Sequence, residues 1–360
     1  GLLFPGGGVG GGNKDEEQEE DAMAGVTRTD SAFVREFAKA SQVSFGGGMQ
    51  QLTDTLEQRL SEDGGVRIIK GDPVCEIGTH PAGTTTTTGV GLTGAAASVR
   101  LASGEVIECD HIFSTLPAPA LRSALLSSLE DRGNATSSND HTTSQGATTG
   151  HAHMAATVSD LLDDIHAVDV GVVNLAFATV PKKLADIPGF GYLVPATEND
   201  RVLGVSFDSC IFPTQGTAAL DATADVPVAG DDAFRVCVMI GGVHGRDVAD
   251  MTEEELTLEA KSGLSRHVGL SDADLDTIVA AKAGVMQQCI PQYYVGHNAL
   301  VRNIERALDP GQGPATHDPP SSAALTVLGN SFYGVGIADC ISRAWSTAQQ
   351  FSKAQQQQQQ

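Results

Sequence analysis

The chain has 360 residues, 45 of them acidic and 22 basic, which gives a formal net charge of -23 at pH 7. This length allows a sizeable core and two domains, and the strongly acidic balance argues against a nucleic-acid partner. Six cysteines are scattered without a Cys-x-x-Cys pair, which favours buried free thiols over disulfides or a metal site. The sequence contains no continuous apolar run of the roughly 18 residues that a membrane-spanning helix needs.

Residues 1–29 contain a glycine run, Gly6 to Gly12, that formally satisfies the Gly-x-Gly-x-x-Gly spacing of a dinucleotide-binding turn. Such a turn needs a buried strand before it and an amphipathic helix after it, whereas an acidic run, residues 13–21, follows here. We therefore predict that residues 1–29 form a disordered glycine-rich and acidic linker that touches no phosphate. Because the chain starts abruptly at Gly1, we expect it to be the C-terminal portion of a longer protein.

From Asp30 onward, helical spacing alternates with short apolar runs, which predicts an α/β chain. Helices are predicted over residues 30–41, 49–60, 252–268 and 297–308, the third with a Thr252/Glu255 capping box. Strands are predicted over residues 66–70, 73–77, 110–117, 170–177, 201–208 and 234–240. Two low-complexity stretches are expected, a loop elaborating a hairpin over 84–97 and a solvated loop over 132–159 with His141, His151 and His153.

Near the C-terminus, residues 324–328 predict a buried strand, and Gly329, Gly334 and Gly336 predict a turn. A helix is predicted next, because apolar residues recur at helical spacing: Ile337, Ile341, Ala344, Trp345, Ala348 and Phe351. The N-terminus of such a helix suits a phosphate, a carboxylate or an electron-rich ring edge. A tight turn that binds nothing is the alternative, since many α/β proteins contain one.

The amino-acid sequence of this stretch is more specific than its pattern of strand, turn and helix. Residues 328–341, LGNSFYGVGIADCI, resemble the C-terminal FAD-contacting segment of the protoporphyrinogen oxidase family, within the flavin amine oxidase superfamily. Further segments resemble the same family in the same order: FGGGM (45–49), PVC (73–75), PGFGYLVP (188–195), LGVSFDSCIFP (203–213), RVCVMIGG (235–242) and CIPQY with GH (289–293 and 296–297). The resemblance covers the chain from about Asp30 onward.

The resemblance implies FAD as the cofactor, bound by Val74, Asn330, Val335, Gly336 and Ile337. It implies a substrate cavity lined by Phe190, Gly191, Leu193 and Met239, although Phe190, Leu193 and Met239 could instead be core residues. No catalytic side chain and no metal ligand is expected, because a flavin carries the redox chemistry itself. His297 could act as a base or ligand, and a cap on the local backbone at the start of its helix is the alternative.

In fold, the resemblance implies an α/β (α+β) chain with two domains. Residues 30–118 and 323–351 would form part of a Rossmann-like FAD-binding domain, with a remnant of a helical membrane domain near 30–45. Residues 165–310 would form a substrate-binding domain with a mixed or antiparallel sheet. An insert over 130–160 and a polar tail over 352–360 complete the expected organisation.

In function, the resemblance implies FAD-dependent oxidation of protoporphyrinogen IX to protoporphyrin IX, with O2 as acceptor, in haem biosynthesis. It implies peripheral attachment to the mitochondrial inner membrane through the missing helical domain, with a plastid as the second option, and it allows a homodimer. The family's N-terminal fingerprint and propionate-binding arginine are missing, so the chain alone is expected to be inactive. Another flavin amine oxidase or desaturase, or a non-catalytic porphyrin-binding fragment, are the alternatives.

Overall fold

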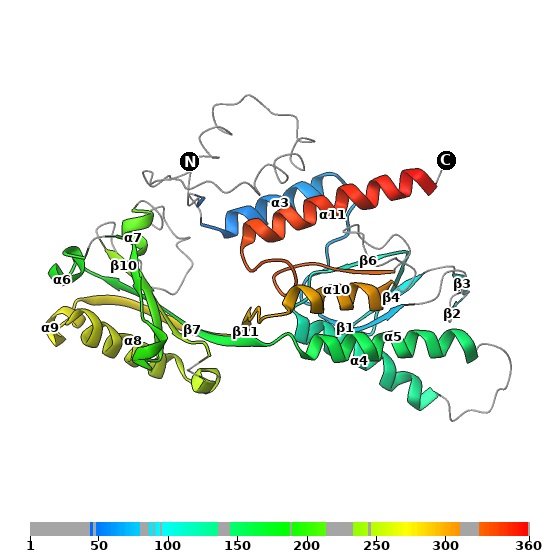
Figure 1. Cartoon of the computed structure of the whole chain (residues 1–360). Helices are drawn as coiled ribbons and strands as arrows, with labels where there is room; N and C mark the ends of the chain where they lie inside the picture. Colours follow the sequence, from blue (N-terminus) through cyan, green and yellow to red (C-terminus); the bar gives the residue numbers. More distant parts are fainter. Residues whose placement is uncertain are drawn as a thin grey trace, which may run out of the picture. The chain divides into compact units, whose positions relative to one another are not determined.

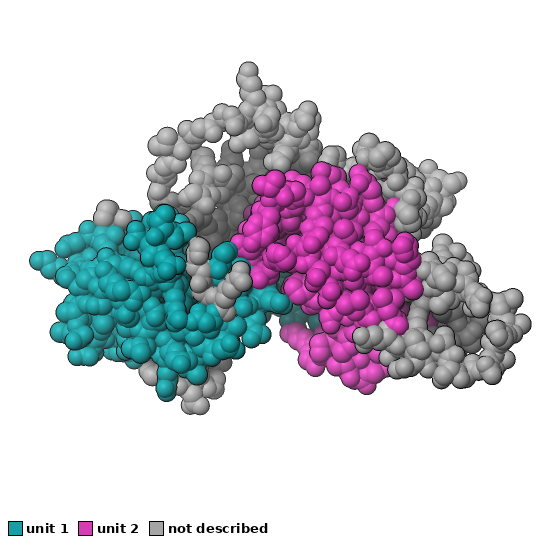
Figure 2. All heavy atoms as spheres, turned by 60° about the horizontal axis from the view of Figure 1, so that its bottom comes forward, with its two compact units in different colours: residues 1–68, 168–289 teal, residues 69–167, 290–360 magenta. Residues whose placement is uncertain are grey.

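The computed structural model contains helices and strands along most of its length, so the predicted α/β class is confirmed (Figure 1). It describes residues 44–45, 48–79, 86–88, 91–93, 96–135, 145–187, 189–213, 233–243, 246–309 and 324–358. The predicted linker over 1–29 and the helix expected over 30–41 lie outside the described residues. The chain divides into unit 1, residues 1–68 with 168–289, and unit 2, residues 69–167 with 290–360 (Figure 2).

Unit 1 is built around a five-stranded sheet with the order β11–β7–β10–β9–β8. The strands are β7 (Ala167–Phe177), β8 (Gly191–Leu193), β9 (Val202–Ser206), β10 (Phe234–Gly241) and β11 (Ile278–Pro291). Strand β10 pairs antiparallel with β7 and with β9, and β8 pairs antiparallel with β9. The predicted strands of this region are confirmed, except that residues 207–208 leave the sheet because helix α7 (Asp208–Ile211) begins there.

Helix α8 (Glu253–Val268) packs on one face of this sheet and starts at the predicted capping box. The Thr252 hydroxyl accepts from the Glu255 amide, and the Glu255 carboxylate accepts from the Thr252 amide at 2.8 Å. Gly171 on β7 permits the close approach, because a Cβ there would lie 2.5 Å from the Leu256 side chain. The core between helix and sheet is apolar and includes Val173, Leu175, Phe177, Val236, Val238, Ile240, Leu256, Ala260 and Leu264.

Shorter elements complete unit 1. They are helix α3 (Gln50–Glu62), α6 (Lys182–Ala185), α9 (Asp272–Leu275), and the 3-10 turns η1 (Ala196–Glu198) and η2 (Arg246–Asp250). The predicted helix over 49–60 is therefore confirmed, but α3 contains no buried residue and its Leu56 and Leu60 are exposed. The apolar side chains of α3 therefore join no core among the described residues of this unit.

Unit 2 contains an antiparallel three-stranded sheet with the order β1–β4–β5. Its strands are β1 (Val74–Thr79), β4 (Ala97–Leu101) and β5 (Val106–Cys109), and the hairpin β2 (Thr86–Thr88) with β3 (Gly91–Thr93) extends the β1–β4 connection. The strand predicted over residues 66–70 is wrong. Val66 and Ile68 are exposed there without strand geometry, since an apolar alternation forms a strand only where a partner strand pairs with it.

A second pair of strands in unit 2 is parallel: β6 (Ile112–Ser114) with β12 (Leu325–Val327). The helices of this unit are α4 (Ala118–Ala135), α5 (Gln145–Asp163), α10 (His297–Leu308) and α11 (Ile337–Gln358). They share an apolar core with the strands, formed by Leu121, Leu125, Val158, Leu162, Val301, Ile304, Leu325, Val327 and Phe332. Helix α10 therefore packs in unit 2, although the sequence grouped residues 290–310 with the substrate domain.

The solvated loop predicted over 132–159 is partly wrong. Helix α5 occupies residues 145–163, and its Ala155, Val158 and Leu162 are buried. These three residues have helical spacing, which the surrounding Ser, Thr and His composition obscured. His151 and His153 lie on this helix, whereas His141 lies outside the described residues.

The cysteines are less buried than expected. All six are free thiols, of which Cys75 and Cys210 are exposed and the others are half-buried. In the part of the chain that the structure describes, no helix is long and apolar enough to cross a membrane.

Candidate functional site

The turn between β12 and α11, residues 328–336, is the first candidate site. The Leu328 amide donates to the Ser114 carbonyl at 2.8 Å, which continues the parallel β6–β12 register into the turn. Gly329 (φ +97°) and Gly334 (φ +133°) adopt backbone conformations that side-chain-bearing residues rarely adopt. The predicted strand, glycine turn and helix are therefore confirmed.

Asp339, which the sequence analysis did not single out, caps the start of α11. Its Oδ2 accepts from the Gly336 amide at 3.2 Å. A Cβ would lie 2.9 Å from that oxygen at Gly336 and 2.5 Å from the Asp339 Cβ at Gly334. Both glycines thus leave room for the capping carboxylate, whatever else approaches the turn. An acidic residue three positions after Gly336 is the signal that could have predicted this cap.

Tyr293 clamps the same turn from a segment that lies just before α10. Its hydroxyl donates to the Asn330 carbonyl at 2.6 Å and accepts from the Gly334 amide at 2.8 Å. His297 stacks on the Tyr293 ring, with centroids 3.7 Å apart and planes 12° apart, and its Nε2 lies 3.1 Å from the Phe332 carbonyl. His297 therefore bonds a backbone carbonyl of the turn rather than the backbone of its own helix start.

A third attachment comes from Tyr333, whose hydroxyl donates to the Glu305 carboxylate. Arg343 lies over the Tyr333 ring, 3.8 Å from its centroid, and contacts Glu305 at 3.3 Å. Burial, with a smaller contribution from the Glu305 charge, raises the pKa of the Tyr333 hydroxyl far above its ordinary value, so it stays a hydrogen-bond donor. The turn is thus held by side chains from α10, α11 and the segment before α10.

The structure brings four of the five predicted cofactor-binding residues together on this turn. Val335 and Ile337 are exposed, 54% and 57%, on either side of Gly336, and Asn330 is half-buried. The fifth, Val74, lies at the exposed start of β1 in the same unit. Apolar side chains beside the glycine backbone at a helix N-terminus fit the edge of a flavin ring, whose reduced form gains negative charge there, although the Gly336 amide itself bonds Asp339.

The apolar stripe predicted along α11 is helical but largely exposed. Ile341 and Trp345 continue the exposed face that begins at Ile337. Among the described residues, the far end of the stripe packs, where Phe351 meets Phe113 edge-on at 5.0 Å. A face of this kind is available for contact with a further surface.

The second candidate site is the face of the unit 1 sheet opposite α8, here called the open face. On β10, Met239 is 40% exposed between the fully buried Val238 and Ile240, so alternate residues point to opposite faces. Leu193 on β8 is 86% exposed and Phe190, just before β8, is 60% exposed. Three predicted substrate residues therefore present apolar side chains that the described core leaves uncovered.

Gly191, the fourth predicted substrate residue, has a structural reason of its own. Its φ is +147°, and a Cβ there would lie 2.2 Å from the Val205 carbonyl on β9. Any larger residue would push β8 away from β9. The glycine thus keeps the edge of the sheet flat beside Leu193.

The end of the open face near α7 is polar but carries little charge. Ser206 pairs across the sheet with Cys237, and its hydroxyl donates to Asp208 at 2.6 Å. Burial and the nearby Asp208 charge raise the pKa of the Cys237 thiol to about 11. Burial also raises the pKa of the Asp208 carboxyl, against the effects of Ser206 and Arg235. The thiol is therefore neutral at physiological pH.

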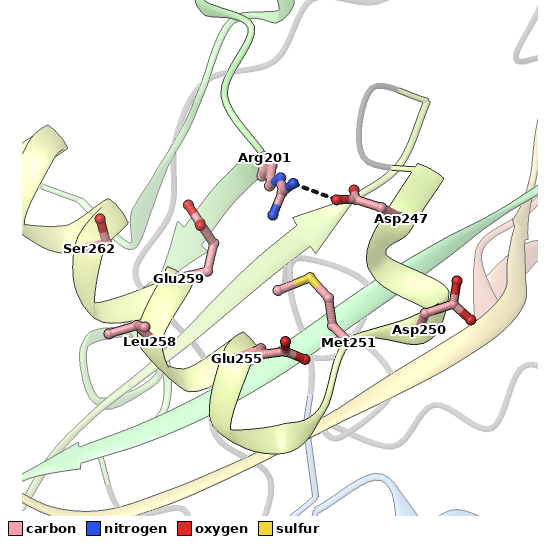
Figure 3. A pocket seen from close by; sticks show the side chains of 8 residues that line it. All are labelled: Arg201, Asp247, Asp250, Met251, Glu255, Leu258, Glu259 and Ser262. Atoms are coloured by element: carbon pink, nitrogen blue, oxygen red, sulfur yellow. Dashed lines mark hydrogen bonds and ion pairs between the residues drawn. The ribbon is translucent and has the colours of Figure 1, made fainter.

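A pocket of about 620 Å³ lies elsewhere in unit 1, between η2, α8 and the start of β9 (Figure 3). Three of its four acidic residues are engaged with the protein: Asp247 pairs with Arg201, Glu259 with Arg266, and Glu255 with the helix cap. It contains none of the predicted cofactor or substrate residues: its lining is Arg201, Asp247, Asp250, Met251, Glu255, Leu258, Glu259 and Ser262. We therefore do not assign the redox site to this pocket.

Comparison with known families settles what class of protein contains these two sites. The model of flavin-containing amine oxidoreductases matches residues 24–350. The chain belongs to this family. The predicted family resemblance, the oxidoreductase class and FAD as cofactor are thereby confirmed at the level of the family.

Several relatives within the family are named protoporphyrinogen oxidase. The Macaca fascicularis protein is 28% identical over 320 residues, covering 87% of this chain and 52% of the relative. The Saccharomyces cerevisiae protein is 27% identical over 322 residues, with 88% and 51% covered. A rice relative named as chloroplastic is 27% identical over 169 residues, 46% of this chain and 27% of the relative.

The chain spans about half the length of the animal and yeast family members that it matches. Among solved structures, the crystal structure of a protein from Exiguobacterium sp. 255-15 superposes with a TM-score of 0.57 at 14% identity. The superposition covers 87% of this chain and 52% of that protein. At this identity the comparison establishes the fold alone.

Proposed function

We propose that this chain is part of an enzyme that oxidises protoporphyrinogen IX to protoporphyrin IX with FAD, using O2 as acceptor, in haem biosynthesis. The observation that carries the proposal is the open face: a sheet with a tightly packed core on one side leaves Leu193 and Met239 uncovered on the other, and Phe190 is exposed just before β8. Apolar walls of this kind suit a large flat macrocycle. The names of the relatives support this substrate over other flavin oxidase substrates.

The cofactor half of the proposal rests on the turn before α11. Asn330, Val335, Gly336 and Ile337, with Val74, would hold FAD, which when bound supplies the acceptor for hydride removed from the substrate. The contribution of this chain is to orient: the helix N-terminus favours negative charge at the ring edge, and Tyr293 and Tyr333 fix the turn. These residues need no proton-transfer role.

The substrate half rests on Phe190, Gly191, Leu193 and Met239. Exposure supports the wall role over the core role for the three apolar residues, because a core aromatic is buried, as Phe207 is at 0%. Phe190 carries no such burial. We propose that it and Leu193 contact the flat faces or edges of the macrocycle, and that Met239 lies on the wall beside them.

Location and partners follow as further parts of the proposal. We place the enzyme at the mitochondrial inner membrane as a peripheral protein, with a plastid as the second option because relatives from rice and tobacco are named as chloroplastic. A homodimer is compatible with the proposal. Membrane contact would come from regions that the longer relatives have and this chain does not match.

The deciding experiment compares Phe190→Ala with Phe207→Ala in the 360-residue chain, using protoporphyrin IX fluorescence to measure binding and thermal melting to measure stability. Phe190→Ala should weaken binding about twofold to tenfold, since an aromatic contact contributes about 0.5–1.5 kcal/mol beyond area burial. Its melting temperature should be unchanged. Phe207→Ala should instead lose about 3–5 kcal/mol of stability, because this ring is fully buried.

Absence of porphyrin binding to the wild-type chain, or unchanged binding in Phe190→Ala, would contradict the substrate assignment. A flavin spectrum of the longer protein then separates the alternatives. Bound flavin without porphyrin binding supports another flavin oxidase, and porphyrin binding without flavin supports a carrier.

A further inference from the structure

A hydrogen-bonded chain of three side chains runs through unit 1 on the α8 side of the sheet. The Nε2 of His267 lies 3.0 Å from Asp200 Oδ2, and its Nδ1 lies 3.3 Å from the Tyr192 hydroxyl. Because a carboxylate only accepts, Nε2 carries a proton toward Asp200, and Nδ1 shares the second hydrogen bond with the Tyr192 hydroxyl. The three side chains are therefore linked in the order Tyr192, His267, Asp200.

The Asp200 end is fixed. Its Oδ1 accepts from the Val202 amide at 2.8 Å and from Arg266 at 2.9 Å, and its side chain is 13% exposed. Arg266 is held in turn by Glu259 and Ser262, which line the pocket of Figure 3. Burial would raise the pKa of Asp200, but the hydrogen bonds from Val202, His267 and Arg266 hold it at about 2. The Asp200 carboxylate is thus ionised at neutral pH and held in place by these hydrogen bonds.

The Tyr192 end is attached to the short strand at the edge of the sheet. Strand β8 has three residues and lies at the end of the strand order. The Tyr192 ring points to the core side, 6.2 Å from the Phe207 ring and 5.7 Å from the His267 ring. The next residue, Leu193, points to the open face, since successive strand residues alternate. A displacement of Tyr192 would therefore move Leu193 and Phe190 as well.

We infer that Tyr192, His267 and Asp200 are positioning residues that hold β8 from its core side, so that Leu193 keeps its place on the open face and Phe190 keeps its place just before the strand. The inference rests on the proposed role of that face in binding the porphyrin. Edge strands open more easily than central ones, because one side of the backbone has no neighbouring strand. Here a part-buried chain of side chains that reaches α8 supplies an additional restraint.

The test uses Tyr192→Phe, which removes the hydroxyl and keeps the ring, in the 360-residue chain. His267→Gln and the double variant complete a double-mutant cycle. Thr257→Val is the matched control, because it removes a hydroxyl on the same helix whose bond, to the Glu253 carbonyl, involves none of the three residues or Arg266. Two quantities are measured: the dissociation constant for protoporphyrin IX, from its fluorescence, and amide hydrogen exchange of the peptides covering residues 190–194 and 234–241.

We expect Tyr192→Phe to raise exchange in residues 190–194 about threefold to tenfold, the effect of losing one buried neutral hydrogen bond. Exchange in residues 234–241 should not change, porphyrin binding should weaken by a similar factor, and Thr257→Val should resemble the wild type. The double variant should be no worse than the worse single variant, since both act through one chain.

Unchanged exchange in residues 190–194 overturns the inference, and so does a rise of equal size in residues 234–241, which would indicate general destabilisation. Faster exchange with unchanged porphyrin binding also overturns it, because β8 would then move without consequence for the open face. Failure of the wild-type chain to bind porphyrin overturns the proposed function instead. In that case the exchange measurement still decides whether the three residues fix β8.

Discussion

Replacing Tyr293 by Phe should loosen the turn before α11 without unfolding unit 2. The variant removes the hydroxyl that donates to Asn330 at 2.6 Å and accepts from Gly334 at 2.8 Å, while the ring can still stack on His297. Two neutral hydrogen bonds contribute about 0.5–1.5 kcal/mol each. Since Tyr293 is 39% exposed, water compensates part of the loss, and we expect the low half of the range, about 1–2 kcal/mol.

The assay is amide hydrogen exchange at Gly334, whose N–H is released by the substitution. A local loss of about 1–2 kcal/mol corresponds to exchange about fivefold to thirtyfold faster. Tyr294→Phe is the matched control, because the neighbouring ring is 56% exposed and its hydroxyl has no hydrogen bond among the described residues. In the flavin-loaded protein, Tyr293→Phe should also lower flavin occupancy.

Unchanged exchange at Gly334 in Tyr293→Phe would refute the clamp. An equal increase in Tyr294→Phe would refute its specificity, because the effect would then come from the whole segment. A large drop in melting temperature would show that Tyr293 supports the core of unit 2 rather than the turn alone.

Three further predictions concern other parts of the chain. Gly334→Ala should cost about 1–3 kcal/mol in urea unfolding, because its φ is +133° and a Cβ would collide with Asp339; Gly64→Ala, at φ +68° in open space, should cost less, and equal costs would contradict the steric argument. Asp200 has a pKa of about 2 in the folded chain, below its unfolded value, so its ionised form stabilises the fold at neutral pH, and this contribution fades as the pH falls from about 4 toward 2. The difference in unfolding free energy between wild type and Asp200→Asn should therefore shrink over that interval. A constant difference would argue against a stabilising role of the ionised carboxylate. The 360-residue chain should bind FAD weakly, since it spans about half the length of its relatives and each missing charge-assisted contact forfeits about 1.5–3 kcal/mol; a sub-micromolar affinity by calorimetric titration would contradict this.

The local features of the sequence determined much of the fold. The strand–glycine–helix order near the C-terminus, the capping box at Thr252 and the helix starting at His297 were all predictable, because each depends on hydrogen bonds or apolar spacing within a few neighbouring residues. The family resemblance added a prediction of which local features approach a flavin. Short windows carry this information regardless of what the rest of the chain does.

Tertiary structure decided which faces are buried and which residues meet. Helix α5 was hidden by its composition, and the stripe on α11 looked like a core face although Ile337, Ile341 and Trp345 are exposed. Burial of a face depends on elements distant in sequence, so periodicity indicates the face but not its partner.

The candidate site shows the same division at the level of single residues. Tyr293 meets Asn330 from 37 positions away, and His267 meets Asp200 from 67 positions away. No local pattern relates these pairs, because the chain brings them together only when helices and strands pack. The sequence determined that a glycine turn and an apolar GFGYL segment exist; the packing of α10 and α8 behind them decided what holds each in place.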